Sequence, residues 1–140
     1  MLPYDSETAA YEYLAHNGVY HWIPHVFGTA VRSPAQWGLE HVDGDEEGDY
    51  YGILMEWIEG GEELTEDNVR AHHVVSFIRG LVRMHDAGVI HNDIEDRNML
   101  VVPGSERAVW IDFSSSRVDA TDDEKDLEMS YAAIHPALMV

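Results

Sequence analysis

The chain has 140 residues, 45% of them hydrophobic, which suits one domain with a real core and argues against disorder. Eight Lys and Arg against 27 Asp and Glu give a formal net charge of −19, so we expect no nucleic-acid partner and no binding to anionic membranes. Cysteine is absent, which excludes disulfides and thiolate metal sites. The N-terminal residues have no signal-peptide pattern and no apolar run reaches membrane-spanning length, so a cytoplasmic protein is predicted.

The first half of the chain predicts one helix followed by three strands. Ser6 can cap a helix that ends at Asn17-Gly18, and residues 26–31 form a strand that Ser33-Pro34 breaks. Two further strands are predicted at residues 37–42 and 50–58, with an acidic turn at residues 43–48 between them. We expect these last two strands to pair with each other in an antiparallel sheet.

The second half predicts a long helix, short strands and a final helix. Thr65 can cap a helix over residues 66–87, in which apolar side chains repeat at helical spacing, and Gly88 ends it. Residues 99–102 and 108–111 are predicted to pair around a Pro-Gly-Ser turn, and a last helix is predicted over residues 122–134. This element order predicts a mixed α+β chain, with a single domain over residues 1–140.

The most informative motif is His91-Asn92-Asp93-Ile94-Glu95-Asp96-Arg97-Asn98, followed by a hydrophobic strand that ends in Asp112-Phe113. This layout is typical of a phosphoryl-transfer site. Asp93 can accept a proton from a substrate hydroxyl. Asn98 and Asp112 offer hard oxygen ligands that suit Mg²⁺. Because the two loops are joined by a short hairpin, we expect the three side chains to face a common cleft. A purely structural alternative has Asp93 and Asn98 only bonding the loop backbone.

Three stretches around this motif resemble the protein kinase-like superfamily, and most of all its fungal members related to aminoglycoside and choline kinases. Residues 81–93 are similar to the helix, glycine and catalytic-loop entry of that family. Residues 53–60 resemble its adenine-site strand and hinge, and residues 7–11 resemble the start of its N-lobe helix. The resemblance implies a minimal kinase-like fold, with a reduced antiparallel N-lobe over about residues 1–59 and a short, mostly helical C-lobe over residues 60–140.

The resemblance also implies a role for individual residues in binding ATP and Mg²⁺. Asp93 would be the catalytic base, and Arg97 would reach the phosphate in place of the usual lysine, since that position is Glu95. Asn98 and Asp112 would be the metal ligands. The remaining cofactor-binding positions would be the N-lobe glutamate and the hinge backbone: Glu7, Met55, Glu56, Trp57 and Ile58.

Some family elements have no counterpart in this sequence. The family places a glycine-rich hairpin and a lysine strand before the N-lobe helix, but only six residues precede Glu7, and the single lysine is Lys125. These elements grip the phosphates, so weak or no catalysis is expected from this chain. The alternative is a non-catalytic pseudokinase that binds a protein partner. A homodimer, or another protein, is expected to cover the open N-lobe.

Two other metal sites have little support in the sequence. The acidic turn Asp43-Gly44-Asp45-Glu46-Glu47-Gly48 matches the first positions of a calcium loop, but position 12 is Leu54 and not Glu. The histidine pair His72-His73 lies on a predicted helix, where adjacent side chains point in different directions. A solvated hairpin tip and ordinary surface or core histidines are the favoured interpretations.

Overall fold

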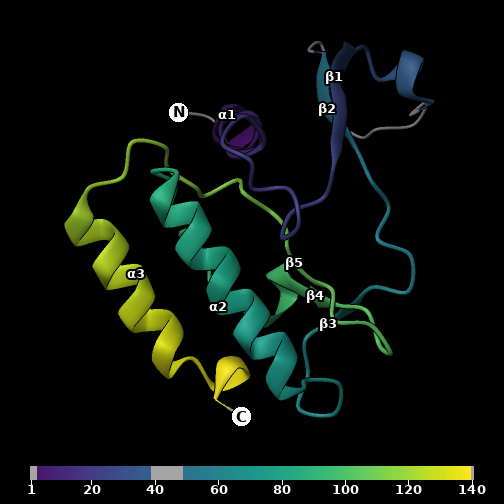
Figure 1. Cartoon of the computed structure of the whole chain (residues 1–140). Helices are drawn as coiled ribbons and strands as arrows, with labels where there is room; N and C mark the ends of the chain where they lie inside the picture. The colour runs from purple at the N-terminus through teal and green to yellow at the C-terminus, as the bar shows by residue number, and fades with distance from the viewer. Residues whose placement is uncertain (1–2, 39–48, 140) are drawn as a thin grey trace. The chain divides into compact units, whose positions relative to one another are not determined.

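The computed structural model of the chain describes residues 3–38 and 49–139 (Figure 1). These residues contain three α-helices and two small antiparallel sheets, which confirms the predicted α+β class. The chain forms two compact units: a larger one from Met1–Pro24 together with Trp57–Val140, and a smaller one from His25–Glu56. The helix at the start of the chain therefore belongs to the larger unit, whereas the first two strands form the smaller unit. The lobe boundary near residue 59 stays a prediction.

The smaller unit is a two-stranded antiparallel hairpin. Strand β1 (Val26–Arg32) pairs with β2 (Tyr50–Met55), from Val26 opposite Met55 to Arg32 opposite Tyr50. After β1, Ser33-Pro34 leads into the short 3-10 helix η1 (Ala35–Trp37), whose Trp37 indole donates to the carbonyl of Tyr50 at 3.3 Å. The Trp37 ring also covers Gly52, where a β-carbon would lie 3.0 Å from the indole.

The predicted pairing of residues 50–58 with residues 37–42 is wrong for the described part of the chain. The partner of β2 is β1, and Trp37 ends a 3-10 helix instead of starting a strand. The physical reason is the proline at position 34, which turns the chain so that the Trp37 indole packs on β2 from the side. Residues 39–42 and the acidic turn at residues 43–48 lie outside the described residues.

Three helices build the larger unit. They are α1 (Pro3–His16), α2 (Ala71–Asp86) and α3 (Asp122–Ile134), and α2 and α3 lie side by side (Figure 1). The predicted bounds of α3 are confirmed, because Thr121 and Glu124 form a complete capping box at its start. The predicted start of α2 at residue 66 is wrong. Thr65 and Asn68 bond each other's backbone N–H groups at 2.8 and 3.2 Å, which closes a separate turn before the helix begins.

The larger unit has its hydrophobic core where α2 packs on a small three-stranded sheet. In this sheet β3 (Glu62–Glu63) pairs with β4 (Met99–Val101), and β4 pairs with β5 (Ala108–Trp110), all antiparallel. The predicted pairing of residues 99–102 with 108–111 is thus confirmed. The fully buried Trp110 donates its indole N–H to the carbonyl of Phe77 on α2 at 3.1 Å.

The motif loop runs between these core elements. It leaves α2 at Gly88, passes an isolated bridge between Ile90 and Arg117, and enters β4 through the 3-10 helix η2 (Asp96–Asn98). A last 3-10 helix, η3 (Pro136–Leu138), follows α3. Of the helices that the structure describes, none combines the length and the hydrophobicity needed to cross a membrane.

Candidate functional site

The motif loop brings Asp93, Arg97 and Asn98 into direct contact. The Asn98 amide donates from Nδ2 to Asp93 Oδ2 at 2.9 Å, and from the same atom to the Asp93 carbonyl oxygen at 2.9 Å. The Arg97 guanidinium donates from Nη2 to both Asp93 carboxylate oxygens, at 2.9 and 3.2 Å. Asn98 is buried, whereas the Arg97 side chain is largely exposed. The carboxylate of Asp93 is therefore held by a buried amide and by an exposed cation.

His91 links the motif loop at Asp93 to the end of the strand at Ile111. Its ring is fully buried, with Nε2 donating to the carbonyl of Ile111 at 2.8 Å and Nδ1 accepting from the backbone N–H of Asp93 at 3.2 Å. These two bonds require a neutral ring with its proton on Nε2. Burial lowers the pKa of His91, although the Ile111 carbonyl and the charges of Glu128, Asp93 and Asp112 offset part of that effect.

Asp112 directly follows Ile111, whose carbonyl accepts the hydrogen bond from His91 Nε2. The backbone N–H of Ile111 donates to the carbonyl of Asn98 at 2.9 Å, which ties the strand end to the motif loop. Asp112 itself has a left-handed backbone with φ of 59°, and its Oδ1 accepts hydrogen bonds from the hydroxyl and the N–H of Ser114. The structure thus gathers Asp93, Asn98 and Asp112 around His91, with the Asp112 conformation fixed by its own turn.

Glu7 on α1 also reaches this region. Burial raises the pKa of Glu7, the negative charge of Asp112 raises it further, and the backbone N–H of Phe113 partly opposes both. The side chain therefore lies beside Asp112 and the residue after it. The resemblance implies an ion pair between this glutamate and a lysine, but the neighbouring charge here is another carboxylate.

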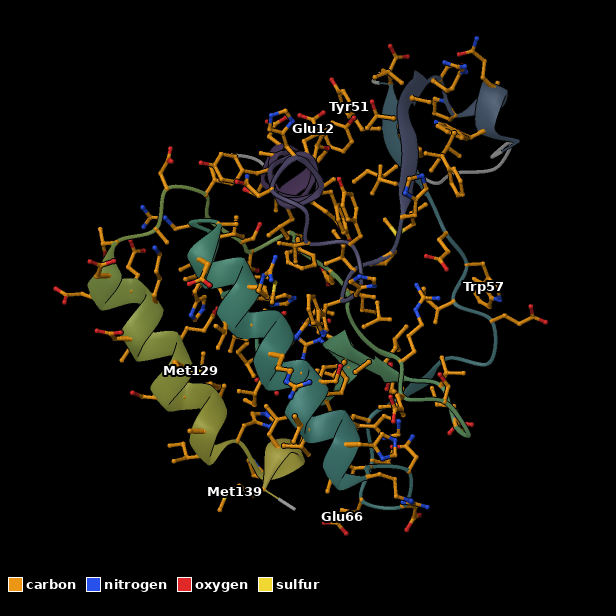
Figure 2. All side chains as sticks on the ribbon, viewed as in Figure 1. Glu12, Tyr51, Trp57, Glu66, Met129 and Met139 are labelled. Carbon is orange, nitrogen blue, oxygen red and sulfur yellow. The ribbon has the colours of Figure 1, made fainter. Side chains whose placement is uncertain are left out.

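The four hinge positions do not all belong to one unit. Met55 and Glu56 are in the smaller unit, where the Glu56 N–H donates to the carbonyl of His25 at 2.7 Å. Trp57 and Ile58 are in the larger unit; Ile58 is buried, while Trp57 is 86% exposed and projects from the ribbon (Figure 2). Their role in binding adenine stays a prediction.

A buried carboxylate on α3 was missed by the sequence reasoning. Glu128 is 7% exposed, and its Oε1 accepts from the N–H of His91 and contacts His85 Nε2, both at 2.9 Å. Its Oε2 accepts from the N–H of Asn92 at 2.6 Å. No local signal in the sequence singles out Glu128, because the burial of Glu128 and of Ala132, four residues later on the same helix face, follows from the packing of α3. Glu128 anchors the start of the motif loop.

The oxygen-rich surroundings of Asp112 suit a hard cation. Within residues 3–38 and 49–139, Asn98 bonds Asp93 twice through Nδ2, so its Oδ1 can serve as a ligand. Asp112 and Glu7 add carboxylate oxygens with like charge. A divalent cation would relieve the repulsion between those carboxylates. In the ranges 3–38 and 49–139, no group of three or more His, Asp or Glu side chains is placed to hold a metal ion by itself. Any Mg²⁺ would thus need phosphate oxygens or water to complete its coordination.

A cavity of about 350 Å³ opens beside Asp93. Its apolar wall comes from Ile90, Ile94 and two α3 side chains, Leu127 and Tyr131. Acidic side chains complete the lining, among them Glu95 and Asp93 itself. The cavity is large enough for a small hydroxyl-bearing molecule or one side chain of a larger substrate.

Comparison with known proteins shows a partial likeness to a kinase. No family model matches the chain. A probable serine/threonine-protein kinase of Dictyostelium discoideum is 34% identical over 90 residues. The match covers 61% of this chain but 13% of the relative, so the chain corresponds to a small part of that protein's length. This likeness supports a kinase-like relationship at a coarse level.

Proposed function

We propose that the chain carries a kinase-like phosphotransfer site that acts with Mg-ATP on a hydroxyl group. The observation that carries this proposal is the 2.9 Å bond between Asn98 Nδ2 and Asp93 Oδ2, next to the backbone link from Asn98 to Ile111 that brings Asp112 alongside. This arrangement presents a carboxylate base and two oxygen ligands from adjoining loops. The likeness to a probable serine/threonine-protein kinase supports the same class of chemistry.

In this proposal Asp93 is the general base. One of its oxygens accepts the proton of the acceptor hydroxyl as the oxygen of that hydroxyl attacks the terminal phosphorus of ATP, and the bond from that phosphorus to the bridging oxygen breaks and releases ADP. The acceptor occupies the cavity of about 350 Å³ that Asp93 lines. Arg97, which is largely exposed, swings from Asp93 toward the transferred phosphate and balances its charge.

Asn98 Oδ1 and the free oxygen of Asp112 would hold the magnesium ion. When bound, Mg²⁺ neutralises the phosphate charge and orients the transferred group. The hydroxyl and the N–H of Ser114 both donate to Asp112 Oδ1, so Oδ2 is the oxygen that would bind the ion. Fixing the ligands before the nucleotide binds reduces the entropic cost of assembling the site.

A non-catalytic role as a protein-binding pseudokinase is the second candidate. It is favoured by Arg97 Nη2, which donates to both oxygens of Asp93, and by Glu95 at the usual lysine position. It is also favoured by Glu7, whose charged neighbour among the described residues is Asp112 and not a basic side chain. A net charge of −19 also opposes the approach of ATP unless a metal ion accompanies it. We therefore expect weak, magnesium-dependent nucleotide binding and very low turnover from this chain.

The two candidates are distinguished by titrating the chain with ATP, with and without Mg²⁺, and by following phosphate transfer to a generic serine peptide. Binding only when magnesium is present would support the phosphotransfer site. No binding at millimolar Mg-ATP would favour the pseudokinase, and efficient transfer would show that Glu95 and the Arg97 contact do not hinder catalysis.

A further inference from the structure

Helix α3 carries large apolar side chains that are exposed to solvent. Leu127, Tyr131 and Ile134 are 73%, 50% and 69% exposed, and their spacing of four and three residues puts them on one side of the helix. We call these three residues the α3 stripe. The inward side chains Glu128 and Ala132 are buried, so the stripe lies beside the packed face of α3. Adjoining exposed apolar side chains on one helix face are typical of a binding surface.

The cavity of about 350 Å³ continues the α3 stripe toward the motif loop. Leu127 and Tyr131 line it from α3, and Ile90 and Ile94, which are both 4% exposed, line it from the loop. Ile134 lies outside this lining. A small molecule in the cavity would therefore leave Ile134 exposed, whereas a longer segment of a protein covers the cavity and the whole stripe.

Two carboxylates lie beside the Tyr131 end of this surface. The buried His135 places them there, because its Nε2 is 3.8 Å from Glu95 Oε2 and 3.8 Å from Asp96 Oδ1, and its ring centroid is 6.0 Å from that of Tyr131. Both carboxylates are well exposed, and within residues 3–38 and 49–139 no Lys or Arg forms an ion pair with either of them. A basic side chain of a ligand can therefore reach them.

The charge of this surface distinguishes between its possible occupants. Asp123, which is exposed one turn before Leu127, gives the other end of the α3 stripe the same negative sign. A second copy of the chain would bring identical carboxylates and a net charge of −19 against this surface, which opposes self-association. A partner with Lys or Arg beside its apolar side chains complements both the stripe and its acidic ends.

We propose that the α3 stripe and the adjoining cavity bind an amphipathic helix of a partner protein, whose apolar face is flanked by Lys or Arg. A helix laid along α3 matches the stripe turn by turn, one of its apolar side chains enters the cavity, and a basic side chain pairs with Glu95 and Asp96. A segment docked here also lies beside Asp93, where it can carry an acceptor hydroxyl. That consequence rests on the proposed function, whereas the binding itself needs neither ATP nor phosphate transfer.

The proposal is tested by calorimetric titration of the full chain, without nucleotide, with a synthetic peptide of about 16 residues that has Leu at helical spacing and Lys between. A scrambled peptide of the same composition should bind at least about tenfold more weakly, because it has no apolar face. Leu127→Ala/Ile134→Ala should weaken binding of the helical peptide about tenfold. Its matched control, Val75→Ala/Val82→Ala, shortens two exposed side chains on α2 and should weaken binding by less than about twofold.

A second pair of variants tests the acidic end of the surface. Glu95→Gln/Asp96→Asn should weaken binding of the helical peptide about fivefold. Its control, Glu12→Gln/Glu66→Gln, removes two exposed carboxylates on α1 and before α2 and should weaken binding by less than about twofold (Figure 2).

Several results would overturn the proposal. Equal binding of the helical and scrambled peptides would show general charge attraction, and equal effects of a variant and its control would place the contact elsewhere. No binding of the helical peptide would exclude such a partner. A dimer of the chain in sedimentation that Leu127→Ala/Ile134→Ala dissociates would show that a second copy occupies the surface. Because no nucleotide is present, these results are separate from any loss of phosphate transfer.

Discussion

The carboxylate of Glu128 on α3 accepts a hydrogen bond of 2.6 Å from the backbone N–H of Asn92 in the motif loop. Asn92 has a positive φ of 70°, a conformation that costs a non-glycine residue roughly 1–2 kcal/mol. The same carboxylate also accepts from the N–H of His91. Glu128 therefore stabilises an intrinsically unfavourable loop conformation just before Asp93, from a helix that follows it in the chain.

We predict that Glu128→Ala lowers the free energy of unfolding by about 2–4 kcal/mol, because three polar groups, two of them on buried residues, lose their carboxylate partner. Chemical denaturation measures this loss. Asp126→Ala, an exposed position on the same helix, serves as the control and should change stability by less than about 0.5 kcal/mol. Similar losses in both variants would show that Glu128 does not anchor the loop.

Gly80 is predicted to be required for the packing of α2 against Trp22. A β-carbon at Gly80 would lie 2.7–2.9 Å from three Trp22 side-chain atoms. The Trp22 backbone is fixed by a 2.7 Å bond from the N–H of Trp110 to its carbonyl. Gly80→Ala gains about 1 kcal/mol of helix propensity but introduces a clash that costs about 1–3 kcal/mol.

We therefore expect Gly80→Ala to destabilise the chain by about 1 kcal/mol, measured as a lower denaturation midpoint. Combining it with Trp22→Leu should remove most of the additional loss, because the smaller side chain leaves room for the methyl group. A Gly80→Ala chain that is more stable than the parent would contradict this packing.

The buried ring of His91 should make the stability of the chain depend on pH. Burial lowers the pKa of His91, so the folded chain keeps the ring neutral where the unfolded chain protonates it, below about pH 6.5. The unfolded state then binds more protons than the folded state, and the free energy of unfolding falls as pH decreases from about 7 to about 5. Above that range the contribution of His91 is constant.

Replacing the ring by a side chain that does not titrate tests this assignment. The free energy of unfolding of His91→Gln, which retains a donor for the Ile111 carbonyl, should fall less steeply between about pH 7 and 5 than that of the parent chain. Identical slopes for the two proteins would mean that His91 is not the group responsible.

The proposed roles of Asp112 and Asp93 predict different effects of two isosteric substitutions, one on ATP binding and the other on phosphate transfer. Asp112→Asn should weaken magnesium-dependent ATP binding about tenfold or more, because it removes a charged ligand. Asp93→Asn should leave binding within about twofold and abolish any residual transfer, because it removes the base. Calorimetry and a phosphate-transfer assay measure the two effects. Equal losses of binding would contradict the division of roles.

Local signals in the sequence predicted several elements correctly. The predicted bounds of α3 match the structure, and its start coincides with a capping box in which the side chains of Thr121 and Glu124 bond each other's backbone N–H groups within a single turn. The pairing of β4 with β5 follows from a short turn between two apolar runs. In both cases the decisive contacts join residues that are close together in the chain, so their spacing alone contains the information.

Elements that depend on competing contacts were predicted less well. The start of α2 was placed at residue 66 because Thr65 is a good cap, but its hydroxyl bonds the N–H of Asn68 within a separate turn, and the helix begins at Ala71. The partner of β2 was misplaced because two apolar strands could each pair with it, and propensity does not distinguish between them.

The sequence by itself determined the α+β class and that Asp93 and Asn98 lie on one short loop. Asp93 and Asn98 are five residues apart across one short turn, so their contact was predictable from spacing. Only the tertiary structure decided that Glu128 holds the loop and that Glu7 lies beside Asp112. These contacts join distant parts of the chain, and they form because the packing of whole helices brings the groups together, which no local pattern of residues encodes.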